Sequence, residues 1–242
     1  MTPRLLMIGA GGLASPVLMI LARSVDVAIT IIDDDVVDET NLHRQLLYRD
    51  HDVGRSKLVV ARERVLEQAA RAHHALDVHT VEGRFTPDNA LALAHAHTLI
   101  VEGADNLATK FLAADAARIT GRPIVQAGVV RWAGWALATV PGGGACMRCI
   151  FEDLPSDRVE TCATAGVIGP VVGAVGALAA SLVLRALWGD PALSGTLHHY
   201  DALTGTLRQR RRSARPDCPL CGAHASIRAI EQARYAAAAC AL

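Results

Sequence analysis

A cluster of glycines near the start of the chain has the composition of a phosphate-binding loop. The run Gly9-Ala10-Gly11-Gly12-Leu13-Ala14 stands between a short apolar stretch and a helical one, where backbone N–H groups at the start of a helix can hold phosphate oxygens. Asp33 follows about 20 residues later, the spacing at which an acidic side chain meets the hydroxyl groups of a ribose. These residues predict a nucleotide site that suits NAD as well as ATP, and a tight turn without a ligand has the same local pattern.

Two Cys-x-x-Cys pairs form a second group of residues that can do chemistry. Cys146 and Cys149 form one pair, and Cys218 and Cys221 form the other. Each pair has the spacing that presents two thiolates to one tetrahedral ion. Together they predict a Cys₄ zinc site with no open coordination position, in which the ion ties the end of the chain to its middle and has a structural role. A redox pair is the alternative for either motif by itself.

The first half of the chain has the pattern of a parallel sheet covered by helices. Short apolar runs alternate there with amphipathic stretches. The predicted strands are 5–8, 28–32, 78–81, 99–102 and 124–130. The predicted helices are 12–23, 55–72, 90–94 and 107–119. After residue 130, antiparallel strands are expected at 135–140, 197–200 and 205–208. The fold class is therefore α/β, with a Rossmann-like doubly wound, mostly parallel sheet and an antiparallel C-terminal extension.

The stretch 165–184 carries no charged residue and approaches the length of a membrane-spanning helix. Pro170, the repeated glycines and the lack of an aromatic residue before Trp188 favour a buried helix with close backbone packing instead. No membrane association is therefore expected.

The overall composition is that of an ordinary globular protein. The 242 residues are 51% hydrophobic, and 24 basic residues balance 24 acidic ones. This composition excludes an extended disordered chain, and the zero net charge provides no general attraction for nucleic acid. The N-terminus does not resemble an export signal, so a cytoplasmic location is expected. In that compartment the six cysteines are better explained as metal ligands or reactive thiols than as a disulfide framework.

Several polar motifs distinguish between the two kinds of nucleotide site. They follow the glycine loop and Asp33 in a fixed order: Asn41-Leu42-His43-Arg44-Gln45, Gly54-Arg55-Ser56-Lys57, Gly103-Ala104-Asp105-Asn106 and Thr161-Cys162. A dehydrogenase has no use for this set. With the cysteine pairs, the ordered motifs resemble the ThiF/MoeB/HesA family of ubiquitin-activating-like adenylyltransferases over nearly the whole chain, from Leu5 to Cys221.

The resemblance implies a reaction between MgATP and a carboxylate. In this family, the C-terminal glycine carboxylate of a ubiquitin-like or sulfur-carrier protein attacks the α-phosphate and yields an acyl adenylate and pyrophosphate. Arg44, Lys57, Asp105 and Cys162 are the expected catalytic residues. The expected nucleotide-binding residues are Gly9, Gly11, Gly12, Asp33, Asn41, Arg44, Gln45, Lys57, Asp105 and Asn106. Of these, Asp33 would hold the ribose and Asp105 would bind Mg²⁺. The simpler alternatives are that Arg44 and Lys57 are solvated surface charges and that Asp105-Asn106 begins a helix.

The resemblance also implies how the chain is organised. It predicts a homodimer of single adenylation domains over residues 1–242, with a nucleotide-binding half (about 1–130), a zinc-bearing and dimerisation half (about 131–225) and a tail (226–242). The glycine-rich segment 166–176 is expected at or near the dimer core. Cys162 matches a cysteine on a loop that crosses the active site, which forms a thioester or acyl disulfide in some members and is dispensable in others. Cys240, in the tail, matches nothing in the family.

Three departures from the family pattern keep other functions open. Ala14 replaces the third loop glycine, and Lys110 replaces an arginine, which keeps the charge but loses the bidentate fork. Many members also lend an arginine from an N-terminal helix to the partner's ATP, whereas only Arg4 is available here. The alternatives are a catalytically weak docking scaffold for a carrier protein, or adenylation of a small-molecule or tRNA-linked carboxylate.

Overall fold

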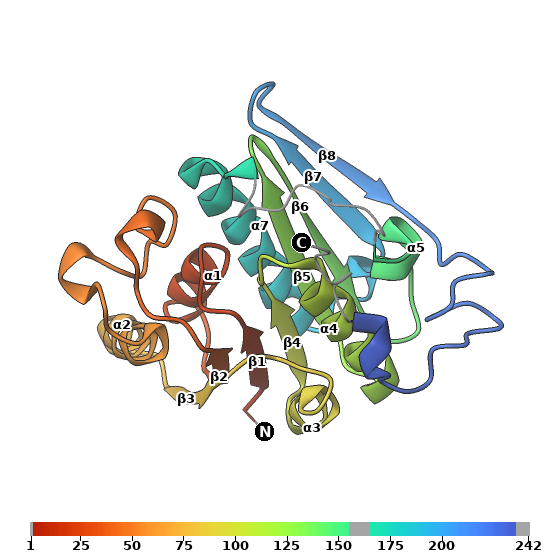
Figure 1. The fold of residues 1–242 in the computed structure, drawn as a ribbon, viewed down its shortest axis with the longest axis horizontal. Coiled ribbons are helices and arrows are strands. Elements are labelled where there is room, and N and C mark those ends of the chain that lie inside the picture. Colours follow the sequence, from red (N-terminus) through yellow and green to blue (C-terminus); the bar gives the residue numbers. More distant parts are fainter. Residues whose placement is uncertain (1, 155–164, 236–242) are drawn as a thin grey trace, which may run out of the picture.

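An eight-stranded sheet with the order β3-β2-β1-β4-β5-β6-β7-β8 organises the computed structural model, which describes residues 2–154 and 165–235 (Figure 1). The strands are β1 (Arg4–Ile8), β2 (Val27–Asp33), β3 (Leu76–Glu82), β4 (Leu99–Glu102), β5 (Ile124–Val130), β6 (Ala133–Thr139), β7 (Thr196–Asp201) and β8 (Thr206–Arg211). The helices are α1 (Ala14–Leu21), α2 (Lys57–Arg71), α3 (Ala90–Ala96), α4 (Leu107–Thr120), α5 (Met147–Phe151) and α7 (Gly169–Leu187). Short 3₁₀ turns are η1 (Glu39–Asn41), η2 (Asp50–Asp52), η3 (Pro191–Leu193) and η4 (Gln232–Tyr235).

The strand directions create one crevice in the sheet. Strands β3, β2, β1, β4 and β5 pair in parallel, and β6, β7 and β8 continue the sheet antiparallel. The chain runs outward from β1 through β2 to β3 and then returns to β4 on the other side of β1. In such sheets, ligands bind beyond the carboxyl ends of the strands where the order reverses. The glycine loop after β1 and the residues after β4 therefore meet at this point.

Alternate residues of each strand point to opposite faces, and each face has its own apolar layer. Leu5 and Met7 of β1 belong to the core under α1, α2 and α7, whereas Leu6 and Ile8 belong to the core under α3 and α4. The α/β fold with a mostly parallel sheet and an antiparallel extension, predicted from the alternating apolar runs, is confirmed.

Helix α7 packs within the domain through small residues. A Cβ atom on Gly176 would lie 2.2 Å from Pro16 Cγ, and one on Gly169 would lie 2.2 Å from the His43 carbonyl oxygen. Both glycines therefore allow close packing inside this chain, whereas Gly173 faces open space. Among the described helices, α7 alone is long and apolar enough to cross a membrane, and it contributes buried residues such as Val175 and Val183 to the core.

Candidate functional site

A cavity of about 630 Å³ opens at the carboxyl ends of β1, β2 and β4. Its wall combines the glycine loop, three consecutive aspartates, two cations from the following segment and the start of α4. The residues named for the nucleotide site that line it are Gly9, Gly11, Gly12, Asp33, Arg44, Gln45, Lys57, Asp105 and Asn106. Residues separated by about a hundred positions in the sequence thus share one cavity. Their individual roles remain predictions.

Close packing requires the glycine at position 12. A Cβ atom there would lie 2.8 Å from Val172 Cγ1 and 3.1 Å from the Arg44 carbonyl oxygen. The Tyr48 hydroxyl donates a hydrogen bond to the Ala10 carbonyl at 2.6 Å and ties the loop to the segment before α2. Sequence reasoning missed Tyr48, because nothing near it in the sequence marks a buried hydroxyl with a distant partner.

Asp33 stabilises the glycine loop directly. One carboxylate oxygen accepts a hydrogen bond from the Ala10 N–H at 2.7 Å, and the other accepts one from the Asp35 N–H at 2.8 Å. The side chain is half-buried in the cavity wall. Each carboxylate oxygen can accept a second hydrogen bond, so these contacts leave room for ribose hydroxyl donors.

Lys57 is a buried cation at the start of α2. Its ammonium group lies 2.7 Å from a carboxylate oxygen of Asp35, and only 4% of its side chain is exposed. This burial excludes the alternative of a solvated surface charge for Lys57. A second pair, Arg84 Nε with Asp34 at 2.9 Å, lies on the cavity rim and is more exposed. The cavity therefore presents positive charge that is held in place by neighbouring carboxylates.

Arg44 lines the cavity with its guanidinium held by its own segment. It donates hydrogen bonds to Asn41 Oδ1 and to the Thr40 carbonyl oxygen. Asn41 itself orients Arg44 and does not line the cavity. Gln45 does line it, and among the described residues its buried Oε1 has no hydrogen-bond donor. A buried amide oxygen without a donor is costly, so a ligand or water donor fits this position.

Asp105 and Asn106 have different surroundings at the start of α4. The Asn106 side chain accepts a hydrogen bond from the Thr109 N–H at 2.8 Å, which makes Asn106 the N-cap of this helix. Asp105 is exposed in the cavity wall, and in the described part of the chain no residue forms an ion pair with it. The carboxylate is available to a hard cation such as Mg²⁺, whereas the Asn106 oxygen already accepts one hydrogen bond as the helix cap.

A buried polar network supports the loop that carries Asp105. Glu102 accepts a hydrogen bond from the Ala104 N–H at 2.6 Å and pairs with the Lys110 ammonium, which also donates to the Ala127 carbonyl oxygen. Burial raises the pKa of Glu102, and hydrogen bonds from Lys110 and Gln126 act in the opposite direction. The Lys110 ammonium is therefore paired inside the protein, and Lys110 does not line the nucleotide cavity.

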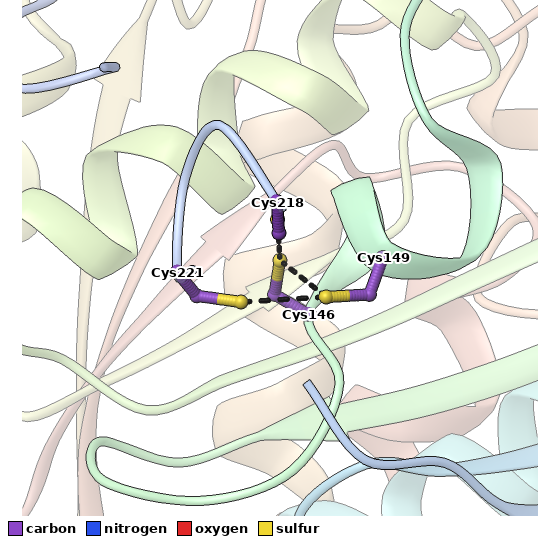
Figure 2. A group of neighbouring side chains, drawn as sticks. All are labelled: Cys146, Cys149, Cys218 and Cys221. Carbon is purple, nitrogen blue, oxygen red and sulfur yellow. Dashed lines mark hydrogen bonds between the residues drawn. The ribbon is translucent and has the colours of Figure 1, made fainter. Parts of the chain in front are cut away.

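The four motif cysteines converge at the start of α5, although the two pairs are far apart in the sequence (Figure 2). The Sγ distances are 3.8 Å between Cys146 and Cys149, 3.6 Å between Cys146 and Cys218, and 3.3 Å between Cys149 and Cys221. Four thiolates about 2.3 Å from a zinc ion lie about 3.8 Å from one another, so this cluster fits one tetrahedral metal.

The electrostatics of the cysteine cluster also suit a metal. Hydrogen bonds from Cys146 and the other thiols lower the pKa of Cys221 to about 5, whereas burial raises the pKa of Cys149 to about 11. The hydrogen bond to Cys221, burial and the charge of the neighbouring thiolates raise the pKa of Cys146, so thiolates in this cluster oppose one another. The Arg215 N–H donates to Cys149 Sγ at 3.3 Å and supports negative charge there. A divalent ion would remove the repulsion.

Cys162 and Cys240 lie outside the described residues, so the role expected for Cys162 stays a prediction. Two other functional candidates were missed from the sequence. Arg148, inside the first cysteine motif, has no exposed surface and forms a bidentate pair with Asp115 of α4. Tyr235 lines the nucleotide cavity from the C-terminal segment. The position of Arg148 between two motif cysteines was the one sequence signal that could have pointed to it. No sequence signal pointed to Tyr235.

The fold and the cavity define a nucleotide-binding α/β domain with a cysteine cluster that can hold a metal. The chain belongs to the ThiF family, which matches residues 2–220. This confirms the resemblance drawn from the ordered motifs.

Relatives of the chain have names that specify a reaction. The SAMP-activating enzyme E1 of Haloferax volcanii is 34% identical over 97% of this chain and 86% of its own length. The sulfur carrier protein adenylyltransferase of Thermus thermophilus is 36% identical over 89% of this chain and 80% of its own length. The adenylyltransferase and sulfurtransferase MOCS3 of Dictyostelium discoideum is 34% identical, but this chain spans 51% of its length.

Solved structures with the same fold include E. coli MccB in complex with AMPCPP and MccA. This structure has a TM-score of 0.75 and 23% sequence identity, and the match covers 91% of this chain and 67% of that one. At this identity the likeness concerns the fold.

Proposed function

We propose that this protein is an ATP-dependent adenylyltransferase that activates the C-terminal carboxylate of a ubiquitin-like or sulfur-carrier protein ending in Gly-Gly. The observation that carries the proposal is that one cavity contains both the buried Lys57 ammonium and the Asp105 carboxylate, which forms no ion pair with any described residue. A triphosphate needs fixed positive charge, and its metal needs a carboxylate. The relatives named SAMP-activating enzyme and sulfur carrier protein adenylyltransferase support the substrate class.

The proposed reaction forms one bond and breaks one. A carboxylate oxygen of the carrier attacks the α-phosphorus of ATP, and the bond from that phosphorus to the oxygen bridging to the β-phosphate breaks, releasing pyrophosphate. Lys57 and Arg44 would stabilise the charge on the phosphate oxygens, because preorganised cations in a partly buried site act where charge develops. Mg²⁺, held by Asp105 when bound, supplies further charge compensation for the leaving pyrophosphate.

Three further features belong to the same proposal. The cysteine cluster would hold one structural zinc ion in each chain, and the protein would act as a homodimer in the cytoplasm. The four converging sulfurs support the zinc.

Carrier-dependent exchange of labelled pyrophosphate into ATP tests the function. The unaltered protein should catalyse exchange with a carrier whose C-terminus is a free Gly-Gly carboxylate, and none with the same carrier blocked as a C-terminal amide. Asp105→Ala should lower the rate at least about a hundredfold, the size of effect seen when a transition-state charge partner is lost. The matched control is Asp77→Ala, because Asp77 is an exposed carboxylate on β3 outside the cavity.

The outcomes separate the alternatives. If the unaltered protein binds the carrier but shows no exchange, it acts as a docking scaffold. If exchange occurs with a small carboxylate and not with the carrier, the substrate class is wrong.

A further inference from the structure

The chain continues past the end of the family match and returns to the nucleotide cavity. The match ends at residue 220, one position before the last metal-site cysteine. After it, Ile227 packs against the cysteine cluster, and Ile230 and Tyr235 pack against the core under α4. In Figure 1, η4 lies beside α4. In the sequence, η4 is far from every other part of the cavity wall. The segment that follows the family match therefore reaches the nucleotide cavity.

Tyr235 is fixed there by a buried hydrogen bond. Its side chain is buried, with 7% of the residue exposed, and it lines the cavity together with Leu112 of α4. Its hydroxyl donates to Asp115 Oδ2 at 2.7 Å. Burial and the neighbouring Asp115 carboxylate raise the pKa of Tyr235, so the hydroxyl keeps its proton and donates.

The acceptor of this hydrogen bond is itself held rigidly. Asp115 has no exposed surface, and Arg148 donates to both of its oxygens, with Nε and Nη2 each at 2.8 Å. A buried ion pair needs additional hydrogen bonds to compensate for the lost hydration, and Tyr235 supplies one. Because Arg148 stands between two of the motif cysteines, the hydrogen bond to Asp115 also links Tyr235 to the segment that carries the first cysteine pair.

Tyr235 lies on the apolar side of the cavity. Phe85, Leu112 and Tyr235 belong to one apolar cluster, and all three line the cavity. The glycine loop, Arg44 and Lys57 supply the polar groups of the same cavity. A nucleotide likewise has an apolar part and a polar part, because its base has flat apolar faces and its phosphates are charged. Aromatic side chains favour packing against such a ring.

We propose that Tyr235 is a nucleotide-binding residue whose ring forms part of the wall against the adenine base, and that Asp115 and Arg148 are the positioning residues that hold it. This inference rests on the proposed function, because it takes ATP as the ligand of the cavity. It gives the segment beyond the family match a role in the site, which the shared motifs do not contain.

Binding of Mg-ATP and of adenosine to the full-length chain, measured by calorimetry, tests the inference. Tyr235→Ala should weaken both ligands by a similar factor of about ten, which corresponds to about 1.4 kcal/mol. Tyr235→Phe keeps the ring but loses the hydrogen bond to Asp115, so it should weaken both ligands by less than Tyr235→Ala does. The matched control is Gln232→Ala, because Gln232 is an exposed residue of the same turn and does not line the cavity.

A second measurement covers the case in which Tyr235→Ala does not fold. Hydrogen exchange of residues 227–235 in the unaltered protein should slow when Mg-ATP is added, because a ligand against the ring stabilises the segment. Unchanged ATP and adenosine affinity in a folded Tyr235→Ala variant, or unchanged exchange in this segment, would overturn the role of Tyr235 while leaving the adenylyltransferase proposal intact. Absence of Mg-ATP binding by the unaltered protein would overturn both.

Discussion

The Lys110 ammonium lies 3.1 Å from each carboxylate oxygen of Glu102, and neither side chain has more than 6% of its surface exposed. The same Glu102 accepts a hydrogen bond from the Ala104 N–H, one residue before Asp105. The ion pair therefore fixes the backbone from which the proposed magnesium ligand projects. Lys110 replaces the arginine expected from the family pattern, and its single ammonium group satisfies Glu102 and the Ala127 carbonyl together.

Removing one partner of this pair should destabilise the protein more than removing both. Lys110→Met leaves the Glu102 carboxylate buried without its cation, and we expect a loss of about 3–5 kcal/mol in the free energy of unfolding. The double variant Glu102→Gln, Lys110→Met should recover much of that loss, because no uncompensated charge is buried. Urea denaturation of the single and double variants measures the difference. Additive effects of the two substitutions would show that the pair is not coupled.

The parts of this fold that depend on local pattern were predictable from the sequence. The strand at 99–102 and the helix that follows it were expected from apolar runs and helical spacing, and both are present at β4 and α4. The meeting of Asp33 and Asp105 at one cavity follows from the rule for parallel sheets, since Asp33 ends β2 and Asp105 lies in the loop after β4. The convergence of the cysteine pairs follows from the geometry of a tetrahedral ion.

Contacts between distant side chains were not predictable in the same way. Nothing in the residues around Lys110 says that its partner is Glu102 and not a phosphate, because both are anions at hydrogen-bonding distance from a helix start. Tyr235 stands in an alanine-rich tail without a recognised motif, and its hydroxyl bonds to Asp115, 120 positions earlier. The predicted helix 12–23 begins later, at Ala14, because the glycine loop takes its first residues. These contacts and boundaries can be identified only from the folded structure.

The cysteine cluster should contain metal in freshly purified protein. We expect about one zinc ion per chain, bound by four thiolates. Removing the ion with a chelator should lower the midpoint of thermal unfolding, because binding to a site formed only in the folded state contributes to folding free energy. Cys221→Ser should have the same effect, and Ser181→Ala, an exposed position on α7, serves as the control. Metal-free protein with both cysteine pairs oxidised to disulfides would contradict this assignment.

Two buried histidines should make the protein less stable in mild acid. Burial lowers the pKa of His97 and of His198 below the ordinary value of 6.5. The His97 ring bonds to the Leu93 carbonyl and the Thr30 hydroxyl, and no described residue bonds to the His198 ring. The unfolded chain binds protons at these positions more readily than the folded one. This contribution to stability is therefore complete above about pH 6.5 and is lost as the pH falls through the lower pKa of the folded state.

Chemical denaturation at pH 7.5 and pH 5.5 measures this pH dependence. His97→Gln removes one of the two groups and should reduce the difference in unfolding free energy between the two pH values. His95→Gln, which changes an exposed position two residues earlier, should leave the difference as it is. An unchanged difference in the His97 variant would show that other groups cause the acid sensitivity.

Cys162 provides the test that separates adenylation from transfer of the acyl group. Formation of the adenylate requires charge compensation at the phosphates and no thiol, whereas capture of the acyl group requires a nucleophilic sulfur, which displaces AMP and forms a thioester. Cys162→Ala should therefore exchange pyrophosphate with the carrier at close to the unaltered rate and should lose a conjugate that is sensitive to thiol reagents. Cys240→Ala is the matched control for loss of a cysteine outside the motifs. If Cys162→Ala still forms the conjugate, the acceptor sulfur lies elsewhere; if it loses exchange as well, the residue acts in the first step.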